Sequence, residues 1–179
     1  MENSLESLVK KRLKSQNYDS PPLHLWQPEL SGDIPITIDA HGDWYHDGGK
    51  IERESIVRLF ASILRKEEDG GYYLVTPSEK WRIKVERHAL LITDISLLER
   101  EGQQVLEATL NTGKQILVSE ETPLFLDNRV EQVAGLKLPH GLTALCTRAA
   151  WYRLVELADA HDGCAVLKSG EYELRLPTA

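Results

Sequence analysis

The chain has 179 residues, of which 41% are hydrophobic and 27% charged, a composition typical of a folded protein rather than a disordered one. Its net charge of -7 argues against general binding to nucleic acid or anionic membranes, so neither is expected as a partner. The N-terminus lacks a signal-peptide pattern, no apolar run approaches the roughly 20 residues of a membrane span, and the two cysteines form no C-x-x-C pair. These features predict a cytoplasmic protein with reduced thiols.

The N-terminal segment (residues 1–18) has leucines at helical spacing, which predicts a short amphipathic helix over residues 3–16. Its opposite face is basic. Two interpretations follow: the helix packs on the protein through its leucines, or it binds a membrane or nucleic-acid surface. The acidic charge of the whole chain favours packing.

The next unit (residues 19–88) opens with a proline-rich connector. Periodicity then predicts a strand at 34–38, a hairpin at 42–49, a helix from 56 to about 66 and strands at 72–76 and 81–85. The alternation is clearest at 81–85, where Trp81, Ile83 and Val85 are separated by charged residues. The glycine pair at 70–71 is a typical helix stop, and it follows a charged run that is expected to end the helix.

The C-terminal unit (residues 89–179) is predicted to be a meander followed by a helix and a hairpin. The expected elements are strands at 90–95, 105–110, 115–118, 124–126 and 135–138, a helix at about 147–160, and closing strands at 165–168 and 172–176.

The two units share an order of features that indicates an internal duplication. In each, a helix is stopped by an Asp-Gly pair (69–70 and 162–163) and is followed by a strand, a turn and an alternating strand. A helix followed by a hairpin is also common by chance, but the repeated helix stop favours duplication. A groove between two related halves would be a natural ligand site.

No catalytic signature is found. The sequence has no G-x-S-x-G, H-E-x-x-H, Walker or G-x-G-x-x-G motif, so an enzyme is not expected, and neither a cofactor nor a bound metal is predicted. The alternative hypothesis is a metal-dependent hydrolase that uses Asp39, Asp43 and His46, because Asp39 and Asp43 would share one face of an extended strand. A protein-interaction module that pairs along a strand edge is a further alternative.

Cationic residues at predicted helix starts favour the binding of an anion. Arg53 and Arg148 begin the two helices, where free amides already attract anions, and Lys80 lies in a nearby turn. Aromatic rings beside these motifs could stack on a planar ligand. The candidate ligand-binding residues are Trp44, His46, Arg53, Thr76, Lys80, Trp81 and Arg148.

Two groups of residues carry a resemblance to a known family. The first is Gly42-x-Trp44-Tyr45-His46-x-Gly48-x-x-Ile51-x-Arg53, with Val57-x-Leu59-Phe60-Ala61-Ser62-Ile63-Leu64 and Tyr73-Leu74-Val75-Thr76-Pro77-x-Glu79-Lys80; the second is Leu145-x-Thr147-Arg148-Ala149-x-x-Tyr152-x-Leu154-Val155-Glu156-Leu157. Together they resemble an uncharacterised bacterial family, domain of unknown function 1285, over residues 30–178. The sequence departs from the family pattern at Lys50 and at Arg87-His88-Ala89.

The resemblance implies an α+β fold of two tandem related units with mainly antiparallel sheet, the C-terminal half being similar to a pleckstrin-homology-like barrel. It further implies a site for a small nucleotide-like or other anionic ligand at the interface of the two halves, in a signalling or regulatory role, and no established enzymatic activity.

Overall fold

The structure, a computed structural model, describes residues 20–177 of the chain. The chain divides into two compact units between Arg87 and His88. The helix predicted at 3–16, and with it the separate segment 1–18, lies outside the described residues. Within residues 20–177, no helix has the length and apolar character needed to cross a membrane.

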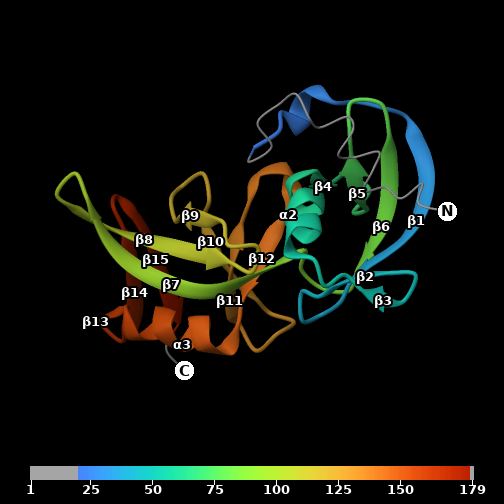
Figure 1. Ribbon diagram of the computed structural model, residues 1–179. Coiled ribbons are helices and arrows are strands. Elements are labelled where there is room, and N and C mark those ends of the chain that lie inside the picture. Colours follow the sequence, from blue (N-terminus) through green and yellow to red (C-terminus); the bar gives the residue numbers. More distant parts are fainter. Residues whose placement is uncertain (1–19, 178–179) are drawn as a thin grey trace. The chain divides into compact units, whose positions relative to one another are not determined.

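The N-terminal unit, as far as it is described, consists of one sheet, one α-helix and a short 3-10 helix (Figure 1). Its elements are η1 (Leu23–Leu25), β1 (Leu30–Ile38), β2 (Trp44–His46), β3 (Gly49–Lys50), α2 (Glu54–Ser62), β4 (Leu64–Lys66), β5 (Tyr72–Val75) and β6 (Lys80–Val85). The strands form a six-stranded sheet in the order β3-β2-β1-β6-β5-β4. The β1–β6 pair is parallel and the other pairs are antiparallel.

The core of this unit follows from the apolar alternation of the sequence. Ile36 and Ile38 of β1 are fully buried, as the period-two pattern predicts. The ring of Trp44 lies 6.1 Å from that of Phe60, the buried residue of α2. The helix is therefore held on the sheet by an aromatic contact between two residues of the first motif.

The C-terminal unit contains two sheets, one α-helix and a 3-10 turn in its described residues. Its elements are β7 (Leu90–Arg100), β8 (Gln103–Leu110), β9 (Gln115–Leu117), β10 (Leu124–Asp127), β11 (Val133–Lys137), η2 (Pro139–Gly141), β12 (Thr143–Cys146), α3 (Arg148–Glu156), β13 (Asp159–His161), β14 (Cys164–Ser169) and β15 (Tyr172–Pro177). The larger sheet has the order β10-β11-β12-β7-β8-β9, with β12 and β7 parallel, and the smaller has the order β13-β14-β15.

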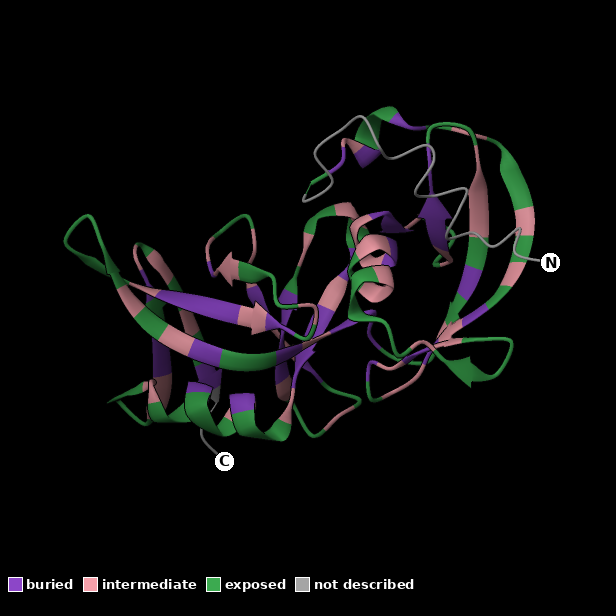
Figure 2. Cartoon of the chain, in the orientation of Figure 1, coloured by how far each residue is buried: buried purple, intermediate pink, exposed green. Residues whose placement is uncertain are grey.

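Helix α3 packs against β7 and β12. Its buried residues are Ala150 and Leu154, and Figure 2 shows this buried side turned toward the strands while the other side is exposed. The buried Ser169 of β14 joins the small sheet to the large one, because its hydroxyl accepts from the amide of Leu106 and donates to the carbonyl of Val118.

The closed barrel expected for the C-terminal half is not seen in residues 88–177. The six-stranded sheet is open, since β9 and β10 are its two edges and are not paired with each other. Tyr172 of β15 contacts the backbone of Leu124 at the β10 edge. The small sheet thus packs beside the large one instead of closing it.

The two units are related in architecture. If the strands of each six-stranded sheet are numbered from one to six along the chain, both sheets have the spatial order 3-2-1-6-5-4. In both, the first and sixth strands are parallel. In both units the helix is also followed by a three-stranded antiparallel meander, β4-β5-β6 or β13-β14-β15. The expectation of two tandem related units with mainly antiparallel sheet is confirmed.

Both predicted helices were too long at their C-terminal ends. Residues 64–66 form β4 instead of the last turn of α2, and residues 159–161 form β13 instead of the end of α3. In each case the segment pairs with the next strand, as Leu64 does with Leu74. Strand β12, at residues 143–146, was not predicted; it pairs with the preceding strand β11 and, in parallel, with the distant strand β7.

Candidate functional site

The predicted aromatic residues lie within or beside the core of the N-terminal unit. Trp44 has only 1% of its surface exposed and is packed on Phe60. Trp81 of β6 is half-buried, with its ring against Gly32 of β1, where an added Cβ would lie 3.4 Å from the ring. Stacking of a ligand on Trp44 would require the core to open, whereas Trp81 keeps part of its ring accessible.

Three further predicted residues lie in the N-terminal unit at places separate from one another. His46 ends β2 with an exposed side chain, 3.6 Å from the carboxylate of Asp47. Arg53 is exposed and immediately precedes α2, but its side chain makes no capping bond to the helix. Thr76 is buried, and its hydroxyl accepts from the amide of Glu79 to close the β5–β6 turn.

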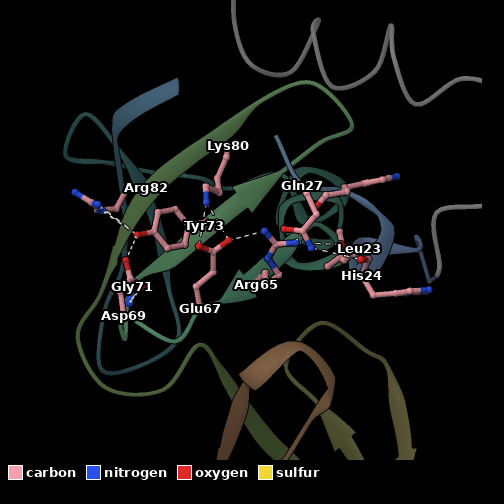
Figure 3. A network of polar contacts seen from close by, with 11 residues as sticks. Leu23, His24, Gln27, Arg65, Glu67, Asp69, Gly71, Tyr73, Lys80 and Arg82 are labelled. Carbon is pink, nitrogen blue, oxygen red and sulfur yellow. Dashed lines mark hydrogen bonds and ion pairs between the residues drawn. The ribbon is translucent and has the colours of Figure 1, made fainter. Parts of the chain in front are cut away.

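Lys80, also predicted, belongs to a network of charged residues on one face of the N-terminal sheet (Figure 3). Its ammonium group lies 3.0 Å from a carboxylate oxygen of Glu67. Arg65, which is only 8% exposed, donates to the same carboxylate and to the carbonyls of Leu23 (3.0 Å) and Trp26 (2.8 Å). Although burial opposes it, the hydrogen bonds from Arg65 and Lys80 lower the pKa of Glu67.

Tyr73 forms the centre of this network. The cations of Lys80 and Arg82 lie 5.0 and 5.6 Å from its ring centroid, and its hydroxyl donates to Asp69 at 2.5 Å. The bonds from Tyr73 and from the amide of Gly71 lower the pKa of Asp69. Each of these cations has an acidic partner: Glu67 for Arg65 and Lys80, and Asp33 for Arg82. Arg65 anchors the segment that carries Leu23 and Trp26, and the pairing leaves little cationic charge for a ligand.

Arg148, the remaining predicted residue, begins α3 in the C-terminal unit. Its guanidinium group lies 5.7 Å from the ring centroid of Tyr152, one helical turn later, and donates to the Tyr152 hydroxyl at 3.3 to 3.4 Å. This hydrogen bond raises the pKa of Arg148. The hydroxyl of Thr147 caps the helix by accepting from the amide of Ala150 at 3.3 Å. Both Arg148 and Tyr152 are exposed, the latter by 56%.

The alternative metal cluster is not assembled. One carboxylate oxygen of Asp39 accepts from the backbone amides of His41 and Asp43, which makes Asp39 a turn-forming residue. The side chain of Asp43 instead accepts from Lys50 at 2.8 Å. In the part of the chain that the structure describes, no group of three or more His, Cys, Asp or Glu side chains could hold a metal ion.

A polar cluster in the C-terminal unit was missed by the sequence reading. The ring nitrogens of His88 lie 2.7 Å from the hydroxyl of Thr143 and 2.6 Å from the carboxylate of Asp127. Hydrogen bonds from Arg129 hold the pKa of Asp127 well below its usual range. Burial acts in the opposite direction, and the hydrogen bond from His88 lowers the pKa further. The partners of His88 are 55 and 39 residues away in sequence, so no local spacing could have indicated this cluster.

Comparison with known proteins identifies the family of this chain. A model for the N-terminal domain of DUF1285, a domain of unknown function, matches residues 21–88, and a model for the C-terminal domain matches residues 89–174. The chain belongs to the DUF1285 family. The boundary between the two DUF1285 models coincides within one residue with the division of the structure into its two units.

Two solved structures of DUF1285 proteins are similar to this one. A family protein from Silicibacter pomeroyi DSS-3 is 31% identical, with a TM-score of 0.85, covering 99% of this chain and 97% of that chain. Another from Shewanella baltica OS155 is 29% identical, with a TM-score of 0.56, covering 69% of this chain and 91% of that chain. No match was found among curated proteins.

Proposed function

We propose that this DUF1285 protein binds a small anionic, nucleotide-like ligand in a signalling or regulatory role, and that the start of α3 is its anion-binding element. The observation that carries the proposal is the meeting of Thr147, Arg148 and Tyr152 at one exposed helix N-terminus. These three residues belong to the second motif of the sequence.

Several groups at this helix end favour an anion. The amides of Arg148 and Ala149 precede the first hydrogen bond of the helix, so helical geometry leaves them without an intrahelical acceptor. The positive end of the helix dipole adds to the guanidinium charge. Because the guanidinium donates to the uncharged hydroxyl of Tyr152, an incoming phosphate would gain a charged hydrogen bond without displacing a carboxylate.

Tyr152 provides a surface for the remainder of such a ligand. Its ring is exposed, so a planar base could stack on it beside the Arg148 guanidinium. By contrast, Lys80 is paired with Glu67 and is a weaker candidate for capturing an anion.

A finer proposal concerns the fold of the C-terminal unit, which we infer to be a distant variant of the pleckstrin-homology type. The support is a strongly curved sheet covered by α3, as Figure 1 shows for β7. The open edges of the sheet and the additional β13-β14-β15 sheet would be the departures from that type.

Thermal unfolding with adenine and guanine nucleotides and with inorganic pyrophosphate tests the proposed binding. A ligand present at 100 times its dissociation constant should stabilise the protein by about 2.7 kcal/mol. The stabilisation should disappear in Arg148→Ala and weaken in Tyr152→Ala, and it should fall as salt concentration rises.

Arg175→Ala is the matched control, because Arg175 is an exposed arginine of the same unit that is paired with Glu173. Its nucleotide response should equal that of the wild type. The proposal is wrong if no member of the panel stabilises the protein, or if the two arginine variants lose the response to the same extent.

A further inference from the structure

A continuous chain of hydrogen bonds runs from a hydroxyl to a carboxylate in the C-terminal unit. The Thr143 hydroxyl contacts Nδ1 of His88 at 2.7 Å, and Nε2 of His88 contacts the Asp127 carboxylate at 2.6 Å. Both distances are short for bonds that involve a ring nitrogen. Thr143 begins β12, Asp127 ends β10, and His88 precedes β7, so three separate segments converge on the imidazole.

The direction of each hydrogen bond follows from the ionisation of Asp127. The backbone amide of Arg129 and its guanidinium group both donate to this carboxylate, which keeps it charged at neutral pH. A carboxylate only accepts, so Nε2 of His88 carries the hydrogen in that bond. In the neutral imidazole Nδ1 then has a lone pair, and the Thr143 hydroxyl must donate to it.

Burial separates the roles of the three side chains. The side chains of His88 and Asp127 are only 4% and 5% exposed, and the ring of Phe125 lies 6.0 Å from the imidazole. Thr143 is only partly buried. Among the three residues, the threonine is therefore the one that a reagent from solvent reaches first, with a fixed base behind it.

We propose that Thr143 is a nucleophile for acyl transfer from small carboxylic esters, with His88 as its general base and Asp127 as the residue that orients the imidazole. Hydroxyl, imidazole and carboxylate are the groups of the serine hydrolase triad, although there the hydroxyl faces Nε2 and the carboxylate faces Nδ1. Either ring nitrogen of an imidazole can act as a base, and here the carboxylate on Nε2 fixes the tautomer in which Nδ1 accepts the proton. This activity departs from the sequence-based expectation of a protein without catalysis.

The reaction balances without a cofactor. The Thr143 oxygen forms a bond to the ester carbonyl carbon while its proton passes to Nδ1 of His88. The ester C–O bond then breaks, and the departing alcohol takes this proton from the imidazole. Water, deprotonated by the same nitrogen, next attacks the acyl carbon of the acyl-threonine. The bond to the threonine oxygen breaks, the carboxylic acid leaves, and the imidazole returns the proton from Nδ1 to the threonine oxygen.

A small fluorophosphonate and 4-nitrophenyl acetate are suitable probes, used on the full-length protein. We expect one fluorophosphonate adduct per chain, located on Thr143 by peptide mass spectrometry, and a burst of about one equivalent of nitrophenolate. Asp127→Asn should slow labelling at least about 100-fold, because without the carboxylate the imidazole tautomer is no longer fixed and general-base catalysis by His88 is lost.

Two threonine variants serve as controls. Thr143→Val has nearly the same shape without the hydroxyl and should not be labelled, whereas Thr143→Ser should be. Thr93, an exposed threonine of β7 whose hydroxyl donates to a backbone carbonyl, should remain unlabelled in every sample. Absence of label on Thr143 in the wild type, or equal labelling in a folded Asp127→Asn variant, would show that the cluster has only a structural role.

Discussion

The two units build the same order of six strands around different buried polar groups. In the N-terminal unit the most buried cation is the Arg65 guanidinium, which binds backbone carbonyls and a carboxylate. In the C-terminal unit the buried group is the His88 imidazole, which binds a hydroxyl and a carboxylate. A shared sheet topology therefore does not fix the chemistry of the interior, and each unit must be judged by its own polar contacts.

The units also differ in where their helices enter. Helix α2 lies between the third and fourth strands of its sheet, so the meander after it completes the same sheet. Helix α3 follows the sixth strand, and its meander forms a separate small sheet. The helix and the meander after it therefore recur in both units, but the meander belongs to the six-stranded sheet in one unit and forms a separate sheet in the other.

Removing the buried cation of the N-terminal unit should cause the largest loss of stability. Arg65→Met leaves two carbonyls and the Glu67 carboxylate with fewer donors, so we expect a loss of about 3–5 kcal/mol in the free energy of unfolding. Urea unfolding followed by tryptophan fluorescence measures it, because Trp26, Trp44 and Trp81 lie in this unit.

Arg82→Met is the control for that substitution. Arg82 lies 5.6 Å from the centroid of the Tyr73 ring and pairs with Asp33, and its side chain is 46% exposed. Its loss should cost less than about 1 kcal/mol, as for other exposed ion pairs. Equal losses in both variants would contradict the distinction between an anchoring cation and a surface one.

The corresponding change in the C-terminal unit should have a smaller and pH-dependent effect. Asp127→Asn weakens charged hydrogen bonds to His88 and Arg129, and we expect a loss of about 2–3 kcal/mol at pH 7. Folding lowers the pKa of Asp127, so its contribution is complete above the usual carboxyl pKa of about 3.9 and declines as the pH falls below it.

Urea unfolding at several pH values, followed by far-ultraviolet circular dichroism, tests this dependence. The difference between wild type and Asp127→Asn should shrink on acidification below about pH 4. Asp94→Asn, which changes an exposed carboxylate of the same unit, should show little difference at any pH. A constant difference for Asp127→Asn across the range would count against the proposed charge state.

Substituting alanine for two glycines that pack against aromatic rings tests how tightly the interior of each unit is packed. A Cβ added at Gly135 would lie 2.5 Å from the Phe125 ring and 2.8 Å from the carbonyl of Ala144, which is fixed in the sheet. A Cβ at Gly71 would meet the Tyr73 side chain at 2.7 Å. We expect Gly135→Ala to cost about 2–3 kcal/mol and Gly71→Ala about 1–2, because a side chain yields more easily than a strand.

The melting temperatures of the two variants show which substitution destabilises the protein more. Gly49→Ala is the neutral reference, since its added Cβ would make only an ordinary 3.5 Å contact with the carbonyl of His46. A larger loss for Gly71→Ala than for Gly135→Ala would reverse the expected ranking of the two interiors.

The smallest expected effect concerns the helix starts. Thr147 caps α3 with its hydroxyl, whereas the side chain of Arg53 makes no such bond at α2. Thr147→Ala should lower stability by about 1 kcal/mol, and Thr147→Ser should retain it. Hydrogen exchange of peptides from α3 would detect the fraying, and equal protection in both variants would show that the cap contributes nothing.

The sequence by itself determined most elements of the chain and the relation between its units. Period-two alternation located β1 and β6, and helical spacing located the starts of α2 and α3. These signals depend on neighbours within a few residues, so one chain contains them in full. The family resemblance drew on the same local motifs.

Only the tertiary structure decided where the helices end and which polar side chains meet. Leu64 joins a strand because β5 is available to pair with it. His88 meets Asp127 although β11 and β12 separate β10 from β7 in the order of the sheet. The same holds for Trp44, whose position in a motif did not reveal that its ring fills the core. Strand pairing and packing join residues far apart in sequence, and local periodicity carries no information about such contacts.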